Sequence, residues 1–328
     1  MSGSPVIFDL KGKRVFVTGH AGMVGSAIVR RLEGEDCDIV MATRRDLDLR
    51  RSDAVDRFMA QAKPDAVFVA AGKVGGIRAN STLPADFIAD NLAIALNTIR
   101  AAHQYGVQKL VYLGSSCIYP RLAPQPMTPD MLLSGALEPT NQWYAVAKIA
   151  GIKLCEAYRL QHGSDFVSVM PTNLYGPGDN YHPQDSHVPA ALMRRFHEAK
   201  VSGAASTTVW GTGSPQREFL AVDDMADACV FVMKSYSDFE FLNIGTGEDT
   251  TIAAFARLVA DVVGYRGKIE FDTSRPDGTP RKLLDVSRIN ALGWRATIPL
   301  REGLAGMYAD FLKRYDTIRT DTEKQASP

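Results

Sequence analysis

Residues 14–32 read RVFVTGHAGMVGSAIVRRL, and this stretch decides the fold class. It opens with apolar and β-branched residues typical of a buried strand, and it ends with apolar residues at helical spacing. Three glycines between them allow a tight turn and a close backbone approach to a pyrophosphate, which the N-terminus of the helix would attract. The stretch therefore predicts a dinucleotide-binding turn. The residues expected to contact the dinucleotide are Gly19, His20, Ala21, Gly22, Met23, Val24 and Gly25.

The same alternation of strand and helix continues through the first half of the chain. Short apolar runs with strand character follow one another at 14–19, 38–43, 65–72, 109–114 and 166–171. The segments between them carry apolar residues at helical spacing, at 25–34, 52–62, 84–106 and 144–163. This βαβ rhythm predicts an α/β protein with a doubly wound parallel sheet of the Rossmann type, whose binding cleft lies at the carboxyl ends of the strands.

The rhythm breaks after about residue 173, at the turn-rich stretch PTNLYGPGDNYHPQDSH (171–187). We expect a smaller α/β lobe that binds the substrate, formed by about 174–240 and 265–318. The dinucleotide-binding domain would then comprise 1–173 and about 241–264. The polar residues 319–328 are expected to form a flexible tail.

Composition narrows the possible functions. The 328 residues are 45% hydrophobic, with 37 Lys and Arg against 37 Asp and Glu, so a nucleic-acid or anionic-membrane binder is not expected. No stretch has the length and apolar character of a membrane span, and no secretory signal is visible. The four cysteines have no metal-ligand spacing, which predicts reduced thiols, no metal site and a cytoplasmic location.

The end of the second strand bears on the choice of cofactor. An acid at this position suits the ribose hydroxyls of NAD, whereas an arginine suits the 2′-phosphate of NADP. The sequence here is MATRRDLDL (41–49), in which Arg44 and Arg45 come first and Asp46 follows. NADP(H) is therefore favoured through Arg44, and Asp46 leaves NAD as the lesser option.

A tyrosine and a lysine lie one helical turn apart in NQWYAVAKIAGIKLCEAY (141–158). Tyr144 and Lys148, at i and i+4, share one face of the predicted helix. Ser115 follows the fourth predicted strand and would approach the same point from the sheet. A phenol titrates near pH ~10, so a neighbouring cation such as Lys148 would help it to act at neutral pH. These three residues are the predicted catalytic group of a reductase.

This constellation resembles the extended short-chain dehydrogenase/reductase family of nucleotide-sugar epimerases, dehydratases and reductases. The stretches GSSCIYP, VMPTNLYGPGDNYHP, VWGTGSPQREFLAVDDMA and PDGTPRKLLDVSR are similar to the GDP-L-fucose synthase branch of that family. The resemblance runs over nearly the whole chain. It implies epimerisation of GDP-4-keto-6-deoxy-D-mannose at carbons 3 and 5, reduction at carbon 4 with NADPH, and a homodimer.

The resemblance also assigns further residues. Cys117 and His187 match the family's acid–base pair for carbons 3 and 5, and which is base and which is acid stays open; His182 is the second choice of histidine. Lys148 would also hold the nicotinamide ribose. Further cofactor contacts fall on Pro171, Thr172, Asn173, Leu174 and His187. Substrate contacts fall on Arg195, Trp210, Arg217, Asp277 and Lys282.

Two points limit what the resemblance implies. Some family members have an arginine in the glycine turn that assists the 2′-phosphate, whereas this chain has Ala21, which weakens the preference for NADP. The alternative functions are a GDP-colitose-type epimerase/reductase, or a UDP-sugar 4-epimerase that retains bound NAD. Cys117 together with His187 argues against the 4-epimerase.

Overall fold

The computed structural model describes residues 5–183, 185–275 and 277–326. Six parallel strands form the larger sheet in the order β2-β1-β3-β4-β5-β9. Their bounds are β1 Arg14–Thr18, β2 Asp38–Val40, β3 Ala66–Val69, β4 Lys109–Leu113, β5 Asp165–Pro171 and β9 Leu242–Ile244. The predicted Rossmann-type sheet is confirmed. The strand order reverses between β1 and β3, which is where sheets of this class bind ligands.

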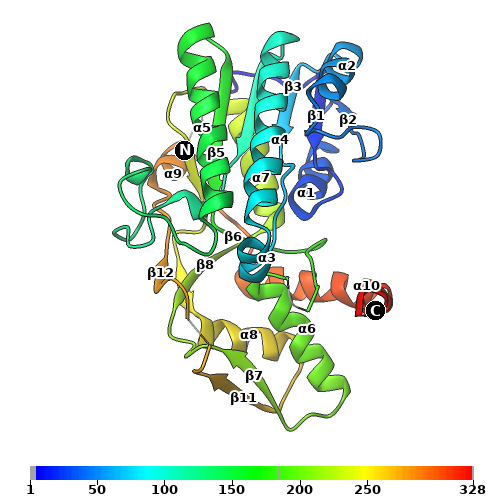
Figure 1. The fold of residues 1–328 in the computed structure, drawn as a ribbon, viewed down its shortest axis with the longest axis vertical. Coiled ribbons are helices and arrows are strands. Elements are labelled where there is room, and N and C mark those ends of the chain that lie inside the picture. Colours follow the sequence, from blue (N-terminus) through cyan, green and yellow to red (C-terminus); the bar gives the residue numbers. More distant parts are fainter. Residues whose placement is uncertain (1–4, 184, 276, 327–328) are drawn as a thin grey trace.

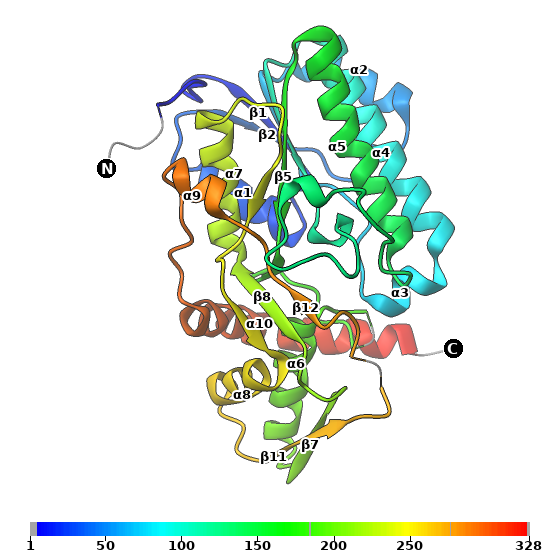
Figure 2. The ribbon, with the colours of Figure 1, turned by 90° about the vertical axis from the view of Figure 1, so that its left-hand side faces the viewer.

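Helices cover both faces of this sheet (Figure 2). On one face α1 (Met23–Leu32) packs against α7 (Val222–Ser235). On the other, α4 (Pro84–Gln104) packs against α2 (Ser52–Ala62) and α5 (Gln142–His162). All five strands predicted in the first half are present, and all are largely buried except β2, because a parallel sheet is covered on both sides.

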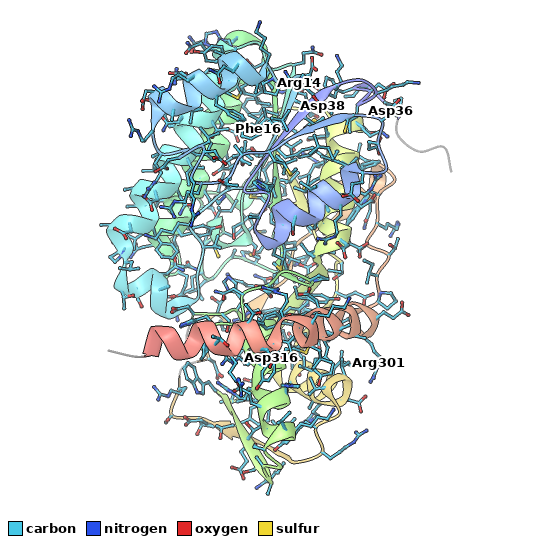
Figure 3. The ribbon with its side chains drawn as sticks, turned by 90° about the vertical axis from the view of Figure 1, so that its right-hand side faces the viewer. Arg14, Phe16, Asp36, Asp38, Arg301 and Asp316 are labelled. Carbon is cyan, nitrogen blue, oxygen red and sulfur yellow. The ribbon has the colours of Figure 1, made fainter. Side chains whose placement is uncertain are left out.

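Side chains fix the edge of the sheet far from the smaller lobe (Figure 3). The Nε of Arg14 lies 3.1 Å from Oδ2 of Asp38, its register partner in the neighbouring strand. Phe16 packs on Phe58 of α2 with ring centres 4.8 Å apart. Because the ion pair is solvated, the apolar contact contributes more to stability than the charges do.

The smaller lobe lies below the carboxyl ends of the large sheet (Figure 1). Its strand β8 (Gln216–Ala221) pairs with β10 (Asp249–Thr251), β12 (Arg281–Lys282) and β6 (Asn173–Tyr175). Strands β7 (Ser206–Trp210) and β11 (Lys268–Asp272) form a separate parallel pair. Helices α6 (Val188–Val201), α8 (Ile252–Val263) and α10 (Leu300–Ala326) complete the lobe. Short helices are α3 (Ile77–Thr82), η1 (Ser116–Ile118), η2 (Pro129–Met131) and α9 (Ser287–Ala291).

Three segments differ from the expected division of the chain. Helix α7 contributes to the core of the large sheet, because its apolar face packs on α1. Helix α8 instead contributes Phe255 and Val259 to the core of the small lobe. The predicted tail 319–328 is helical as far as Ala326, because α10 continues to that residue, and residues 327 and 328 lie outside the described residues. The remaining boundaries of the two units stay a prediction.

Candidate active site

The glycine turn connects β1 to α1 at the point where the strand order reverses. A Cβ on Gly19, whose φ is 69°, would lie 2.8 Å from Cα of Ala71, which follows β3. A Cβ on Gly25 would lie 2.1 Å from the carbonyl oxygen of Gly19. Only glycine fits these two positions, so the backbone of the turn stays open and close to the sheet.

The turn has the polar character that a diphosphate requires. No acidic residue lies in the first turn of α1, and no side chain caps it. Nδ1 of His20 is buried there without a hydrogen-bond partner among the described residues. Free N–H groups, the positive end of the helix dipole and an unpartnered ring nitrogen together fit a bound dinucleotide.

The region after β2 supports Arg44 rather than Asp46 as the contact for the adenosine ribose. Asp46 accepts a hydrogen bond from the hydroxyl of Thr43 at 2.6 Å, so this carboxylate is engaged locally. Arg44 is exposed beside Asp48. Hydrogen bonds from Arg50 lower the pKa of Asp48 to about 2, and the charge of Arg44 adds to this.

The predicted residues of the β5–β6 connection lie at the carboxyl end of the sheet. Pro171 ends β5, and Asn173 and Leu174 open β6. Thr172, between them, donates its backbone N–H to the carbonyl of Ile244 at 3.0 Å. This connection therefore lies at the same edge of the sheet as the glycine turn, where a cofactor would pass.

Four predicted catalytic residues are brought together at the ends of β4 and α5. Ser115 caps η1, and its Oγ accepts a hydrogen bond from the backbone N–H of Cys117 at 3.3 Å. The same hydroxyl is hydrogen-bonded to Tyr144. Nζ of Lys148 donates to the carbonyl of Leu113 at 2.8 Å and lies 5.8 Å from the ring centre of Tyr144. The i, i+4 spacing thus places both side chains near the carboxyl end of β4, which Ser115 follows.

The surroundings of these groups set their protonation. Burial raises the pKa of Tyr144, a charge on Cys117 raises it further, and the hydrogen bond with Ser115 opposes both. Burial lowers the pKa of Lys148 from 10.5 to about 8. The expected lowering of the tyrosine pKa by Lys148 is therefore not what this structure gives, because desolvation is the largest influence on the phenol. A phenol held neutral is in the form that can donate a proton.

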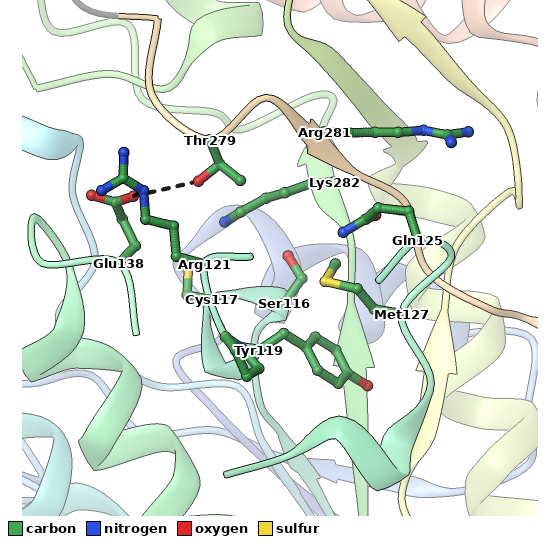
Figure 4. A pocket seen from close by; sticks show the side chains of 11 residues that line it. Ser116, Cys117, Tyr119, Arg121, Gln125, Met127, Glu138, Thr279, Arg281 and Lys282 are labelled. Carbon is green, nitrogen blue, oxygen red and sulfur yellow. Dashed lines mark hydrogen bonds and ion pairs between the residues drawn. The ribbon is translucent and has the colours of Figure 1, made fainter. Parts of the chain in front are cut away.

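A pocket beside Cys117 joins the two parts of the molecule (Figure 4). Lys282 extends from β12 of the small lobe toward the loop that carries Cys117, and Arg121 and Glu138 face the same space. Nε of Arg121 lies 3.3 Å from Oε2 of Glu138. Arg281, also in the lining, has its Nε 2.5 Å from Oδ2 of Asp249.

His187 reaches this region from α6, where it is the N-cap residue. Burial lowers the pKa of His187, because it disfavours the charged imidazolium, and the positive charge of Lys282 lowers it further. Lys282 is therefore close to both Cys117 and His187. His182, the second choice, has its Nδ1 3.3 Å from Oδ2 of Asp185.

The remaining predicted substrate residues lie on the small lobe. The guanidinium of Arg195 lies 5.8 Å from the ring centre of Trp210, and Arg275 lies 5.2 Å from the same ring. Trp210 is 60% exposed, so its flat face is available to a base. Arg217 and Asp277 interact electrostatically, and Asp277 also accepts from the N–H of Thr212 at 2.7 Å.

Two residues absent from the predictions hold the site together. Asn141, the N-cap residue of α5, donates its side-chain amide to Sγ of Cys117 at 3.4 Å. Glu218 is fully buried and accepts from the N–H groups of Thr246, Gly247 and Leu284 at 2.7, 2.8 and 3.0 Å. A polar N-cap before YAVAK could have drawn attention to Asn141, whereas the burial of Glu218 has no signal in the sequence.

No helix among residues 5–183, 185–275 and 277–326 is long and apolar enough to cross a membrane. Within the same ranges, no three His, Cys, Asp or Glu side chains gather as metal ligands.

Comparisons with known proteins agree with this geometry. Residues 15–245 match the NAD dependent epimerase/dehydratase family. The chain is 58% identical to GDP-L-fucose synthase 1 of Arabidopsis thaliana over 304 residues, covering 92% of this chain and 94% of that protein. It is 56% identical to GDP-L-fucose synthase of Escherichia coli K12 over 317 residues, covering 94% and 99%.

A solved structure is similar over almost the whole chain. It is a GDP-L-fucose synthetase from Naegleria fowleri bound to NADP, 27% identical, with a TM-score of 0.86 over 96% of this chain and 98% of that one. The family match covers both the glycine turn and the Tyr144–Lys148 helix. The chain therefore belongs to the NAD dependent epimerase/dehydratase family, in its GDP-L-fucose synthase branch.

Proposed function

We propose that this protein converts GDP-4-keto-6-deoxy-D-mannose into GDP-L-fucose, with epimerisation at carbons 3 and 5 and reduction at carbon 4. The observation that carries this proposal is the grouping of Ser115, Cys117 and Tyr144 at the end of β4, beside a pocket that Lys282 enters from the small lobe. A plain reductase needs the serine and tyrosine but has no use for a thiol and a histidine.

The cofactor is NADP(H), held by the glycine turn, by Arg44 on the adenosine side and by Lys148 on the nicotinamide side. When bound, NADPH supplies a hydride to carbon 4 of the sugar. Tyr144, whose pKa burial keeps high, gives its proton to the oxygen on carbon 4, and Ser115 hydrogen-bonds the same oxygen.

Epimerisation uses the same oxygen as its electron sink. The ketone at carbon 4 acidifies the protons on carbons 3 and 5, because removal of either proton gives an enolate. Ser115 and Tyr144 donate hydrogen bonds to that enolate oxygen. Cys117 and His187 exchange the protons, one removing a proton and the other returning one to the opposite face. Lys282, near both, holds positive charge beside the reacting sugar.

The nucleotide half of the substrate lies on the small lobe. Trp210 offers its exposed face to guanine, and the guanidinium groups of Arg195 and Arg217 bind the diphosphate. Asp277 holds the loop before Lys282 through its contacts with Thr212.

The test is product analysis with GDP-4-keto-6-deoxy-D-mannose and NADPH. We expect loss of absorbance at about 340 nm and a product whose proton NMR spectrum is that of GDP-L-fucose. A product reduced at carbon 4 but unchanged at carbons 3 and 5 would contradict the epimerase half of the proposal. No turnover with this sugar, together with turnover of a 3-deoxy GDP-sugar, would contradict the assignment of substrate.

We also propose a cytoplasmic homodimer that packs through α4 and α5. These two helices pack side by side, and on them Leu96, Val146 and Leu160 are 51%, 41% and 79% exposed. Exposed apolar side chains on two neighbouring helices favour an interface. Light scattering after gel filtration should give twice the mass of the 35.8 kDa chain, and Val146→Glu should reduce it to one chain.

A further inference from the structure

Asn141 lies at the start of α5, where a side chain normally caps the helix, but its amide contacts a thiol instead. Asn141 is the N-cap residue of α5, where asparagine usually accepts a hydrogen bond from a backbone N–H of the first turn. Here its side chain makes no such bond. Its Nδ2 instead donates to Sγ of Cys117 at 3.4 Å, across 24 residues of sequence.

The other end of the amide is also unusual. Oδ1 of Asn141 is buried and has no hydrogen-bond partner among the described residues. A buried acceptor without a partner costs free energy, and so does a helix start without its cap. Sites that break such local rules are often functional. The two losses together indicate that the contact with Cys117 is the reason for this side-chain orientation.

We propose that Asn141 is a positioning residue for Cys117: its amide N–H fixes the sulfur and stabilises the thiolate form that the acid–base role needs. The inference rests on the proposed function for the purpose of the thiolate, but the contact itself is independent of the sugar. A hydrogen bond donated to a sulfur anion favours the anion over the neutral thiol. The amide does this without bringing a second charge into the pocket.

Two of the three cations that line the pocket beside Cys117 are paired, and the charge of the third, Lys282, is the same in every variant at position 141. On α5, Tyr144 is neutral at physiological pH because burial raises its pKa. Arg121 is paired with Glu138, and Arg281 is paired with Asp249. Lys282 is the remaining cation in the lining of the pocket, and its charge also acts on His187.

The test is the pH dependence of alkylation of Cys117 by iodoacetamide, followed by mass spectrometry of the peptide that contains it. Asn141→Ala should raise the midpoint pH of alkylation by about one unit, which corresponds to about 1.4 kcal/mol. Asn141→Asp keeps a strong N-cap residue but removes the donor and adds a like charge. We expect it to raise the midpoint further, although it should restore the melting temperature.

Controls separate this role from a structural one. Asn97→Ala removes another buried amide, which lies on α4 and donates to the carbonyl of Leu49. It should lower stability while leaving the midpoint unchanged. A midpoint within about 0.2 units of wild type in folded Asn141→Ala, or a midpoint restored by Asp, would overturn the proposal. Because no sugar is used, failure of the proposed substrate would leave this result intact.

Discussion

The catalytic groups on the sheet side of the site contact one another, whereas the arginines on the lobe side donate to backbone carbonyls of the lobe. Ser115 is hydrogen-bonded to both Cys117 and Tyr144. On the lobe, Arg195 donates to the carbonyl of Thr208 and Arg217 to that of Gln216. The sheet side is therefore preorganised for chemistry. On the lobe side, the arginines can replace their hydrogen bonds to the backbone with hydrogen bonds to a ligand. Mutations of the sheet-side groups and of the lobe arginines should accordingly separate into effects on kcat and effects on KM. His187, carried by α6 of the lobe, acts with Cys117 and belongs with the first group.

The largest effect is expected at Tyr144. Tyr144→Phe removes the proton donor and should lower kcat for reduction by about 10²- to 10⁴-fold with little change in KM for the GDP-sugar. Tyr158→Phe, on the same helix but away from Ser115, is the matched control and should retain wild-type activity. Steady-state kinetics that show a change mainly in KM for Tyr144→Phe would contradict the division between the two sides.

The next largest effect is expected at the acid–base pair. Cys117→Ser and His187→Asn should each slow solvent exchange at carbons 3 and 5 by at least about 10²-fold, because each removes one proton-transfer group. Binding of NADPH, followed by fluorescence, should be unchanged in Cys117→Ser. Cys37→Ser changes a free thiol that does not line the pocket and serves as the control. If Cys117→Ser or His187→Asn shows the wild-type rate of exchange, the substituted residue has no part in the proton transfer.

On the lobe side we expect a moderate effect on binding. Arg217→Ala should raise KM for the GDP-sugar by about tenfold or more and change kcat little, since a charge-assisted hydrogen bond contributes about 1.5–3 kcal/mol. Arg301→Ala removes an exposed arginine paired with Asp261 and should have no effect (Figure 3). A loss of kcat without a change in KM would indicate that Arg217 acts in the chemical step.

The cofactor preference should depend on Arg44. Arg44→Ala should raise KM for NADPH by about tenfold and leave KM for NADH nearly unchanged, because only NADPH carries the 2′-phosphate. Arg45→Ala is the neighbouring control, with the smaller effect. An equal rise for both cofactors would contradict the assignment of Arg44.

The smallest effect on activity is expected at the junction of the two regions. Asp179 is 4% exposed, and burial raises its pKa from 3.8 to about 7. Between pH about 4 and 7 the folded chain therefore holds a proton that the unfolded chain has lost, so this group's contribution to stability falls as pH rises through that window. Asp179→Asn cannot ionise. Wild type should lose about 2 kcal/mol of unfolding free energy between pH 5 and pH 8 through this group, and the variant should not lose it. Urea titrations of both proteins at the two pH values measure this difference. An unchanged pH dependence would contradict this.

Local rules predicted the sheet side, whereas two short strands of the lobe and the placement of two helices depend on the whole fold. The glycine turn, the buried β4 and the Tyr144–Lys148 helix follow local rules, so their residues and spacing were sufficient. Strands β10 and β12 are three and two residues long, and they exist because β8 pairs with them. The placement of α7 and α8 also depends on which core their apolar faces meet, which is a property of the whole fold.

The residues of the site divide in the same way, into those that local sequence patterns predict and those that only the whole fold brings together. The position of Ser115 at the end of a strand and the i, i+4 pair were visible in the sequence. Other contacts join residues far apart in the chain. Asn141 donates to Cys117, and Glu218 accepts from the backbone N–H of Leu284. The approach of Lys282 to both Cys117 and His187 likewise depends on how β12 pairs with β8.

Complementary isotope labelling tests most directly whether one site performs both epimerisation and reduction. With unlabelled NADPH in D₂O, the product should carry deuterium at carbons 3 and 5 and protium at carbon 4. With NADPH deuterated at the transferred position in H₂O, deuterium should appear at carbon 4 alone. A product with solvent deuterium at neither carbon 3 nor carbon 5 would show that Cys117 and His187 do not exchange protons with the sugar, and would contradict the account.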